Sequence, residues 1–265
     1  MRTIPRAFFV GLPLVLVLAG AASARSLPAP ADYGTVTIDN FSPQAGIPPV
    51  RFDHWLHRSK FTCRVCHVDI GFAMEAKGTK IRADMNMKGF YCGSCHNGRV
   101  TDDGEKVFPA CSTDPTSKKN RECLGCHSVD SKIRGKYDYV SFTKNLPKQG
   151  TGALVDWEKA EAQGLIKPAD SVPGLSVRRP PMAAQADFSI TSRGWMPDIL
   201  FSHKKHALWN GCEVCHPDIF PSVKKGAVRY SMFQIFDGEY CGVCHGRVAF
   251  PLYDCEKCHV DRVRR

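Results

Sequence analysis

Cys63-Arg64-Val65-Cys66-His67 is the first of six Cys-x-x-Cys-His pentapeptides in a chain of 265 residues. The other five occupy residues 92–96, 123–127, 212–216, 241–245 and 255–259. With 13 cysteines and 10 histidines in the chain, random placement would produce about 0.02 such pentapeptides, so a chance origin is excluded. The repeated pentapeptide therefore carries the chemistry around which the chain must fold.

The pentapeptide is the attachment signal for a c-type haem, in which two cysteines form thioethers with the porphyrin and the next histidine ligates its iron. Paired Cys-x-x-Cys units also build structural zinc sites, and a disulfide framework is a further alternative. Zinc would not require a histidine directly after every second cysteine, so we expect six covalently attached haems. The expected attachment residues are Cys63, Cys66, Cys92, Cys95, Cys123, Cys126, Cys212, Cys215, Cys241, Cys244, Cys255 and Cys258.

The first 24 residues have the pattern of an export signal. Arg2 and Arg6 form a basic start, residues 7–20 are almost wholly apolar, and small residues at 22–24 offer a cleavage site. The apolar run is short for a membrane span, so we expect no stable span after cleavage, with an uncleaved anchor as the alternative. This predicts an exported protein, in the periplasm or else at the outer-membrane surface or outside the cell.

The formal charge of +10 suggests a nucleic-acid partner at first, but the expected haems change this interpretation. Loss of Arg2 and Arg6 with the leader, and two ionised propionates on each ferric haem, lower the net charge to about +2. We therefore expect lysine and arginine side chains to pair with propionates, and no nucleic-acid partner.

The ratio of chain length to cofactor predicts the fold class. Without the leader, roughly 40 residues remain for each haem, which is too few for a protein core around each one. We expect a mostly irregular chain with short α-helices and a small N-terminal β element near residues 33–39, wrapped around covalent haems that form the core.

The motifs form two groups of three, and the groups are copies of one unit. Residues 52–57 (Phe-x-His-x-x-His) match residues 201–206, and the same spacing relates the first two motifs of each group. The first unit has additional residues before its third motif, mainly at 111–120, around the odd cysteine Cys111. We expect a first triheme unit at 25–128, a linker at 129–198 with one helix near 154–164, and a second triheme unit at 199–265.

Six irons need twelve axial ligands if all are six-coordinate. The motifs supply six histidines, and four others remain, all within the repeated Phe-x-His-x-x-His element. Residues i and i+3 of a helix share a face one turn apart, so each pair can reach two irons. Solvated or core histidines are the alternative. The expected histidine ligands are His67, His96, His127, His216, His245, His259, His54, His57, His203 and His206.

One iron in each unit is then left without a sixth histidine. Methionine is the expected substitute, because its thioether is a soft neutral ligand. Met232 is the candidate in the second unit, and alignment of residues 78–85 with 226–232 makes Met85 its counterpart, with Met87 as a near alternative. A gap-filling role for these methionines, or an empty sixth position, competes with this assignment.

The order of these elements resembles the triheme c7-type domains of the class III, cytochrome c3-like family. The resemblance covers residues 50–128 and 199–260 and includes Gly-x-Tyr-Cys-Gly-x-Cys-His at the second motif of each unit. It implies that the first histidine of each pair serves the first haem of its unit and the second serves the next haem. It also implies that a residue before the second motif, often methionine in tandem c7-type proteins, serves the third haem. The added residues and the long linker depart from the family pattern.

The leading functional hypothesis is electron transfer, because fully ligated haems change their coordination little between ferric and ferrous states. The resemblance implies redox partners such as cytochromes, quinol-linked donors or outer-membrane conduits, in respiration to metals or other extracellular acceptors. The alternative is a multihaem reductase with an open iron at the Cys123/Cys126 or Cys255/Cys258 haem. A subunit of a conducting filament or of an outer-membrane conduit is a third possibility.

Overall fold

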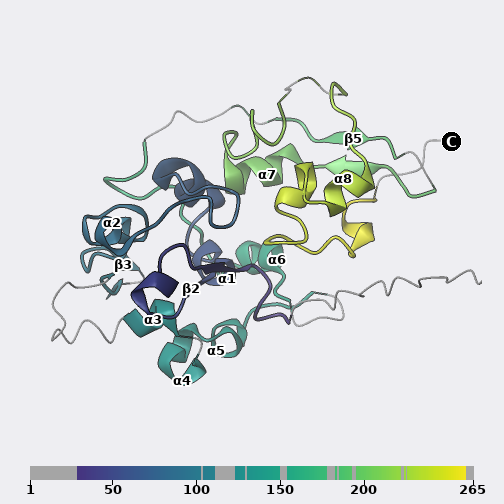
Figure 1. Ribbon diagram of the computed structural model, residues 1–265. Helices are drawn as coiled ribbons and strands as arrows, with labels where there is room; N and C mark the ends of the chain where they lie inside the picture. Colours follow the sequence, from purple (N-terminus) through teal and green to yellow (C-terminus); the bar gives the residue numbers. More distant parts are fainter. Residues whose placement is uncertain are drawn as a thin grey trace, which may run out of the picture.

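Short helices and two-stranded hairpins alternate with irregular loops, as expected (Figure 1). The structure is a computed structural model that describes residues 29–260 except 103, 111–122, 129, 150–153, 178–182, 184, 193–194, 222–223 and 225. The expected leader, the segment around Cys111 and the Arg178-Arg-Pro-Pro stretch of the linker lie outside the described residues. In the part of the chain that is described, no helix is long and apolar enough to cross a membrane.

Each unit begins with an antiparallel hairpin that runs directly into a short helix. In the first unit, strand β1 (Thr35–Ile38) pairs with β2 (Val50–Asp53), and α1 (His54–Arg58) follows at once. In the second, β5 (Phe188–Ile190) pairs with β6 (Ile199–Phe201), and α7 (His203–Asn210) follows after one residue. The expected N-terminal β element is therefore present, and an equivalent hairpin precedes α7, with its first strand in the segment 129–198 that was predicted as linker.

A second pair of equivalent helices precedes the second motif of each unit. Helix α2 (Ala83–Met87) contacts a 3-10 turn at Tyr91–Ser94, and α8 (Met232–Phe236) contacts the 3-10 turn at Tyr240–Val243. The first motif of the first unit continues into a π-helix at Val65–Ile70, and the third motifs form helix α3 (Cys123–His127) and a 3-10 turn at Cys255–Lys257. The first motif of the second unit, residues 212–216, forms turns. A further 3-10 turn, Pro43–Ala45, lies in the β1–β2 loop.

The linker contains more structure than the sequence indicates. The helix expected near 154–164 is present as α6 (Trp157–Ala162), and α4 (Ser131–Arg134), a 3-10 turn at Gly135–Tyr137 and α5 (Tyr139–Thr143) lie before it. Trp55 of α1 packs against the rings of Tyr139 and Phe142, at centroid distances of 5.2 and 5.5 Å. These helices are shorter than the window in which hydrophobic periodicity can be recognised, which is why they were not predicted.

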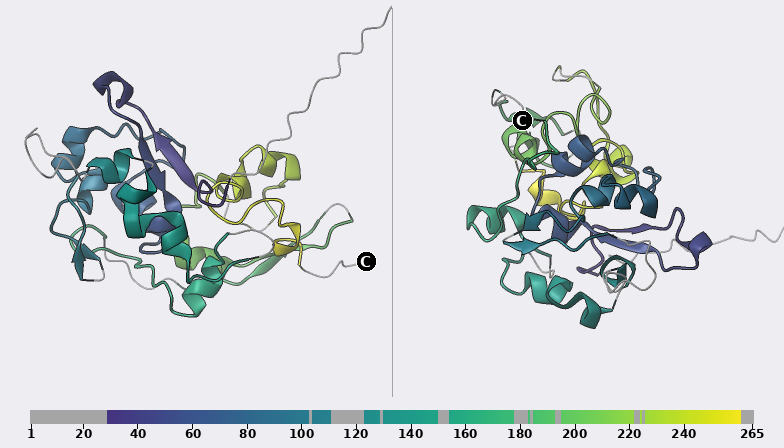
Figure 2. Two further views of the ribbon diagram at one scale, coloured as in Figure 1. Left: turned by 90° about the horizontal axis from the view of Figure 1, so that it is seen from below. Right: turned by 90° about the vertical axis from the view of Figure 1, so that its left-hand side faces the viewer.

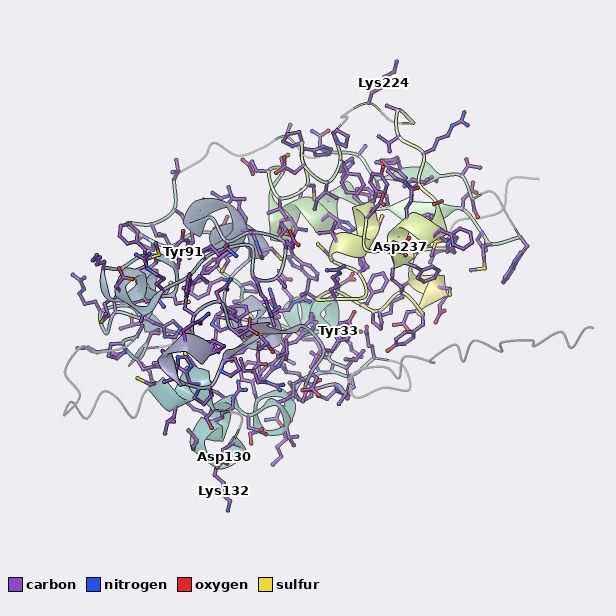
Figure 3. All side chains as sticks on the ribbon, viewed as in Figure 1. Tyr33, Tyr91, Asp130, Lys132, Lys224 and Asp237 are labelled. Carbon is purple, nitrogen blue, oxygen red and sulfur yellow. The ribbon has the colours of Figure 1, made fainter. Side chains whose placement is uncertain are left out.

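Very little of the described chain forms a protein core. Nine hydrophobic residues are buried, and five of them, from Tyr139 to Val172, belong to the linker. Large apolar side chains are instead exposed in both units, among them Phe90, Phe233 and Phe236. The perpendicular views show the first unit and the second unit side by side, with the α6 segment near their boundary (Figure 2). Tyr33 lies near the middle of the molecule, whereas Lys132 and Lys224 lie at opposite edges (Figure 3).

The additional residues of the first unit are divided between two places. His96 and Phe108 are 12 residues apart, whereas the equivalent His245 and Phe250 are 5 apart. The extra residues between His96 and Phe108 include a hairpin of β3 (Thr101–Asp102) and β4 (Glu105–Lys106). The remainder falls in the undescribed segment 111–122, so the added length predicted around Cys111 is only part of the difference.

Candidate haem attachment and ligand site

Each motif forms one turn of helix that brings its three functional side chains together. The backbone N–H of the motif histidine donates to the carbonyl of the first cysteine in four motifs, with N···O distances of 2.8 Å at His96, 2.9 Å at His216 and His245, and 3.0 Å at His259. Residues i, i+3 and i+4 of such a turn lie on one side. Both cysteines and the histidine can therefore face the same porphyrin.

The Gly-x-Tyr-Cys-Gly sequence at the second motif has a structural cause. Tyr91 and Tyr240 adopt positive φ angles of 48° and 51°, a conformation that non-glycine residues seldom adopt. A Cβ atom on Gly93 would lie 1.8 Å from the carbonyl oxygen of Asn86, and one on Gly242 would lie 1.9 Å from that of Ile235. The second motif therefore packs against the preceding helix by direct backbone contact, which only glycine allows.

The repeated phenylalanine of Phe-x-His-x-x-His fixes the orientation of both histidines. Phe52 stacks on His57 at 4.3 Å and meets His54 edge-on at 4.8 Å. In the second unit, Phe201 stacks on His206 at 4.4 Å and meets His203 edge-on at 5.0 Å. This nearly identical arrangement, at the end of the second strand in both units, sets two imidazoles one helical turn apart.

Three of the four expected ligand pairs face each other across a gap that fits an iron. The ring centroids of His54 and His67 are 6.4 Å apart and their planes are inclined by 3°. The ring centroids are 6.4 Å apart for His57 with His96 and 6.2 Å apart for His206 with His245, with the planes inclined by 57° and 60°. Two metal–nitrogen bonds of about 2.0 Å, with the distance from each nitrogen to its ring centre, require about 6.3 Å.

The fourth expected pair is not brought together in the same way. Within the described residues, His203 makes ring contacts with Phe188 and Phe201 but none with His216. His216 instead contacts Phe220. The two side chains belong to the elements that the resemblance implies, so their pairing stays a prediction.

All ten histidines have one ring nitrogen, Nδ1, within hydrogen-bond distance of a backbone carbonyl oxygen. A ligating histidine typically donates its second ring N–H in this way, which fixes the tautomer and leaves Nε2 for the metal. The distances lie between 2.6 Å at His127 and 3.3 Å at His245. The carbonyls belong to Gly34, Asp53, Phe72, Phe108, Pro48, Ala186, Ser202, Phe220, Phe250 and Pro197, for His54, His57, His67, His96, His127, His203, His206, His216, His245 and His259 respectively.

Burial keeps six of the candidate histidine ligands neutral. Desolvation lowers the pKa of His54, His96 and His245 to about 4, and it also lowers the pKa of His57, His67 and His206. The uncharged imidazole is the form that ligates iron, so these side chains are in the binding state at neutral pH.

The third motifs are anchored by residues that the sequence analysis did not consider. The rings of His127 and His259 lie against the carbonyls of Pro48 and Pro197, which precede the second strand of each hairpin at equivalent positions. The third motif therefore returns to the start of its own unit, despite the different lengths of chain between them. The equal spacing of Pro48 and Pro197 within the repeat is a signal that would have found this contact.

The methionines do not occupy the equivalent positions that we expected. Gly93 approaches Asn86, and its counterpart Gly242 approaches Ile235, so Asn86 and Ile235 are equivalent in α2 and α8. In this register Met85 corresponds to Gln234, and Met232 corresponds to Ala83. The alignment of Met85 with Met232 was therefore wrong, because it was anchored on loop glycines instead of on the helix contact.

The attachment cysteines form a connected series across the molecule. Burial raises the pKa of Cys66 to about 12, and the neighbouring thiols of Cys95, Cys63 and Cys92 add to the rise. Burial likewise raises the pKa of Cys244 to about 12, and Cys63 is the first of the thiols that add to it. The first motif of the first unit therefore lies beside the second unit. No disulfide joins any two of the described cysteines.

Comparison with known proteins gives one family. The sequence profile described as "Cytochrome c7 and related cytochrome c" matches residues 50–128 and 199–261. Among solved structures, a c7-type three-heme cytochrome domain is 37% identical, covering 28% of this chain and 90% of the domain, with a TM-score of 0.26. The C-terminal hexaheme fragment of GSU1996 is 25% identical over 85% of this chain and 96% of the fragment, also with a TM-score of 0.26. No curated protein gives a significant match.

Proposed function

Because the chain belongs to the family of cytochrome c7 and related c-type cytochromes, whose members bind haem c and transfer electrons, we propose that it is a six-haem electron carrier. We place its action outside the cytoplasm, most simply in the periplasm, between redox partner proteins in a respiratory chain that ends at metals or other extracellular acceptors. The twelve motif cysteines would hold the haems by thioether bonds. Haem c supplies reversible one-electron chemistry when it is bound.

The observation that carries this proposal is the set of facing histidine rings at 6.2–6.4 Å. A gap of this size supports two nitrogen ligands on one iron, and the carbonyl contact at each Nδ1 supports an Nε2 ligand. The chain's own task is to hold both ligands fixed, so that little must rearrange when an electron arrives or leaves. His203 with His216 would form the fourth such pair by analogy.

The third haem of each unit leaves room for a second candidate function. Met85, Met87 and Met232 remain the proposed sixth ligands, but the register of α2 and α8 places Met232 and Met85 at different helix positions. This difference favours unequal coordination at the Cys123/Cys126 and Cys255/Cys258 haems. An open iron at either haem would give a reductase site in the same protein.

Carbon monoxide binding to the reduced protein separates the two candidates. A fully ligated carrier contains six haems by mass spectrometry, binds no stoichiometric carbon monoxide, and shows the absorption signature of methionine-ligated ferric haem. Met85→Ala, Met87→Ala and Met232→Ala should identify the ligands, because loss of a true ligand opens one iron to carbon monoxide. Stoichiometric uptake by the unmodified protein without a methionine signature would instead establish an open iron, and fewer than six haems would refute the carrier as proposed.

A further inference from the structure

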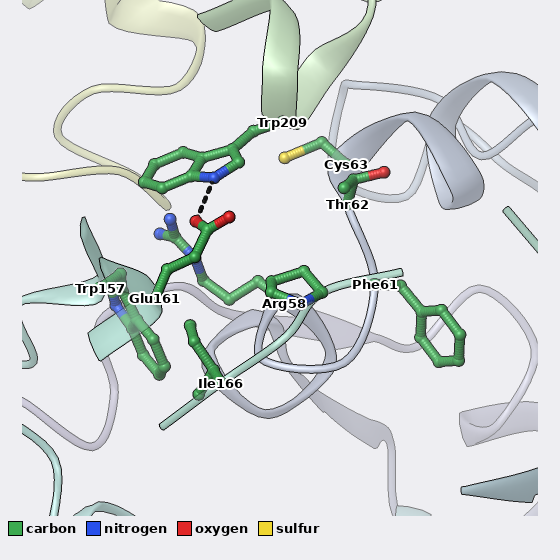
Figure 4. Close-up of a pocket in the computed structure, with 9 residues that line it drawn as sticks. Arg58, Phe61, Thr62, Cys63, Trp157, Glu161, Ile166 and Trp209 are labelled. Carbon is green, nitrogen blue, oxygen red and sulfur yellow. Dashed lines mark hydrogen bonds between the residues drawn. The ribbon is translucent and has the colours of Figure 1, made fainter. Parts of the chain in front are cut away.

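One arginine lies at the junction of the two units and the linker. The guanidinium of Arg58, at the end of α1, lies 5.1 Å from the ring centroid of Trp157 and 5.2 Å from that of Trp209 (Figure 4). Trp157 begins the linker helix α6, and Trp209 belongs to α7 of the second unit. A cation held over two aromatic faces is stabilised by both rings.

Hydrogen bonds complete the connection between the three parts. Arg58 Nη1 donates to the carbonyl oxygen of Val248, in the second unit, at 3.0 Å. The Trp209 indole N–H donates to Glu161 Oε2 of α6 at 2.6 Å. Arg58, which belongs to the first unit, is thus in direct contact with the linker and with the second unit.

The same junction contains an attachment cysteine of the first unit. Cys63 lines one pocket together with Arg58, Trp157 and Trp209 (Figure 4). Burial raises the pKa of the Cys63 thiol and the positive charge of Arg58 opposes the rise, so the two groups are electrostatic neighbours. Cys63 therefore lies at the boundary with the second unit, to which Trp209 belongs.

Arg58 has no equivalent arginine in the second unit. The position equivalent to Arg58 in the second unit is Ala207, and the position equivalent to Trp209 in the first unit is Lys60. Each unit thus contributes one residue that its copy lacks, as expected for a contact made only where the two copies meet.

From this geometry we propose that Arg58 is a positioning residue for electron transfer between the two units. It holds the Cys63 attachment site of the first unit against Val248 of the second, whose backbone N–H donates to the carbonyl of Cys244 at 2.9 Å. Its guanidinium, which is protonated at neutral pH, supplies a fixed positive charge there. A fixed positive charge disfavours the ferric state relative to the ferrous state, so it raises the midpoint potential of nearby haems. This inference rests on the proposed electron-carrier function.

Two variants of the full, haem-loaded protein test the proposal. Arg58→Met removes the charge and the cation–π contacts, and should lower the midpoint potentials of the Cys63/Cys66 and Cys241/Cys244 haems more than those of the other haems. NMR spectra at successive stages of reduction resolve the individual haems. Arg58→Lys keeps the charge but loses the planar contact with both tryptophans. The midpoint potentials of the junction haems should therefore stay close to those of the unmodified protein, while small-angle X-ray scattering detects a looser arrangement of the units.

The matched control removes one positive charge at a distance from the junction. Lys136→Met alters an exposed linker residue paired with Glu105 and should shift no haem selectively. The proposal is overturned if Arg58→Met shifts the junction haems no more than Lys136→Met does, with unchanged scattering. Failure of the carrier function itself would appear earlier, in the unmodified protein, as incomplete haem loading or an open iron, so the two failures are distinguishable.

Discussion

At the scale of single residues, Gly93 and Gly242 are the positions where the backbone most clearly requires glycine. Each lies so close to a backbone carbonyl that an added Cβ would be within 2 Å of the oxygen. We expect Gly93→Ala and Gly242→Ala each to destabilise the loaded protein by about 1–3 kcal/mol, because the motif must move away from the preceding helix. Denaturant unfolding, followed by the loss of haem ligation in the visible spectrum, measures the change.

Gly125→Ala is the matched control for these two substitutions. Gly125 also lies within a Cys-x-x-Cys-His motif, but an added Cβ would meet Phe108 at 3.4 Å, which is ordinary van der Waals contact. Its unfolding free energy should change by less than half as much. Equal effects at all three glycines would contradict the contact-based explanation and indicate a general cost of altering the motif.

At the scale of elements, the strand-to-helix junction before α1 depends on one buried carboxylate. Asp53 is 2% exposed, accepts a hydrogen bond from Thr35 at 2.8 Å, and pairs with Arg51 at 3.1 Å and with Arg134 of the linker. Asp53→Asn removes the carboxylate that pairs with the partly buried Arg134, and it leaves Arg51 with only one of its two carboxylate partners, Asp32. We expect a loss of about 3 kcal/mol in unfolding free energy, measured by denaturant titration of the loaded protein.

The second unit provides the comparison, because Ser202 stands at the equivalent position. Ser202 accepts a hydrogen bond from the Lys205 backbone N–H and caps α7. Ser202→Ala should therefore cost about 1 kcal/mol, the usual loss for a helix cap. A cost for Asp53→Asn no greater than that for Ser202→Ala would show that the buried ion pairs contribute little.

The same elements show which features a sequence can and cannot reveal. The haem motifs, the Phe-x-His-x-x-His repeats and the helix containing Trp157 were predictable, because each follows from local spacing or from repetition. The Nδ1 contacts at Pro48 and Pro197 join segments far apart in the chain, so no local pattern indicates them and only the repetition of the two prolines points to them. The junction around Arg58 was not predictable for a related reason. It is formed by residues that differ between the two copies, and a comparison of the repeats identifies only residues that they share.

At the scale of the whole molecule, the described residues bury little apolar surface among themselves. The described residues bury nine hydrophobic side chains, and more than half of these lie in the linker. Large apolar residues such as Phe90, Phe233 and Phe236 are more than half exposed. This pattern of burial and exposure is expected if porphyrin rings cover these side chains and replace the usual core.

We therefore expect the haem-free chain, made by replacing every motif cysteine with serine, to lack a cooperative fold. Without the cofactors, the conformational entropy of the irregular loops exceeds what so few buried side chains can offset. Circular dichroism should show mostly coil and a gradual, non-cooperative thermal change, whereas the loaded protein should unfold in a cooperative transition. A sharp unfolding transition in the haem-free chain would show that the protein part folds by itself, and the haems would then occupy a prebuilt scaffold instead of forming its core.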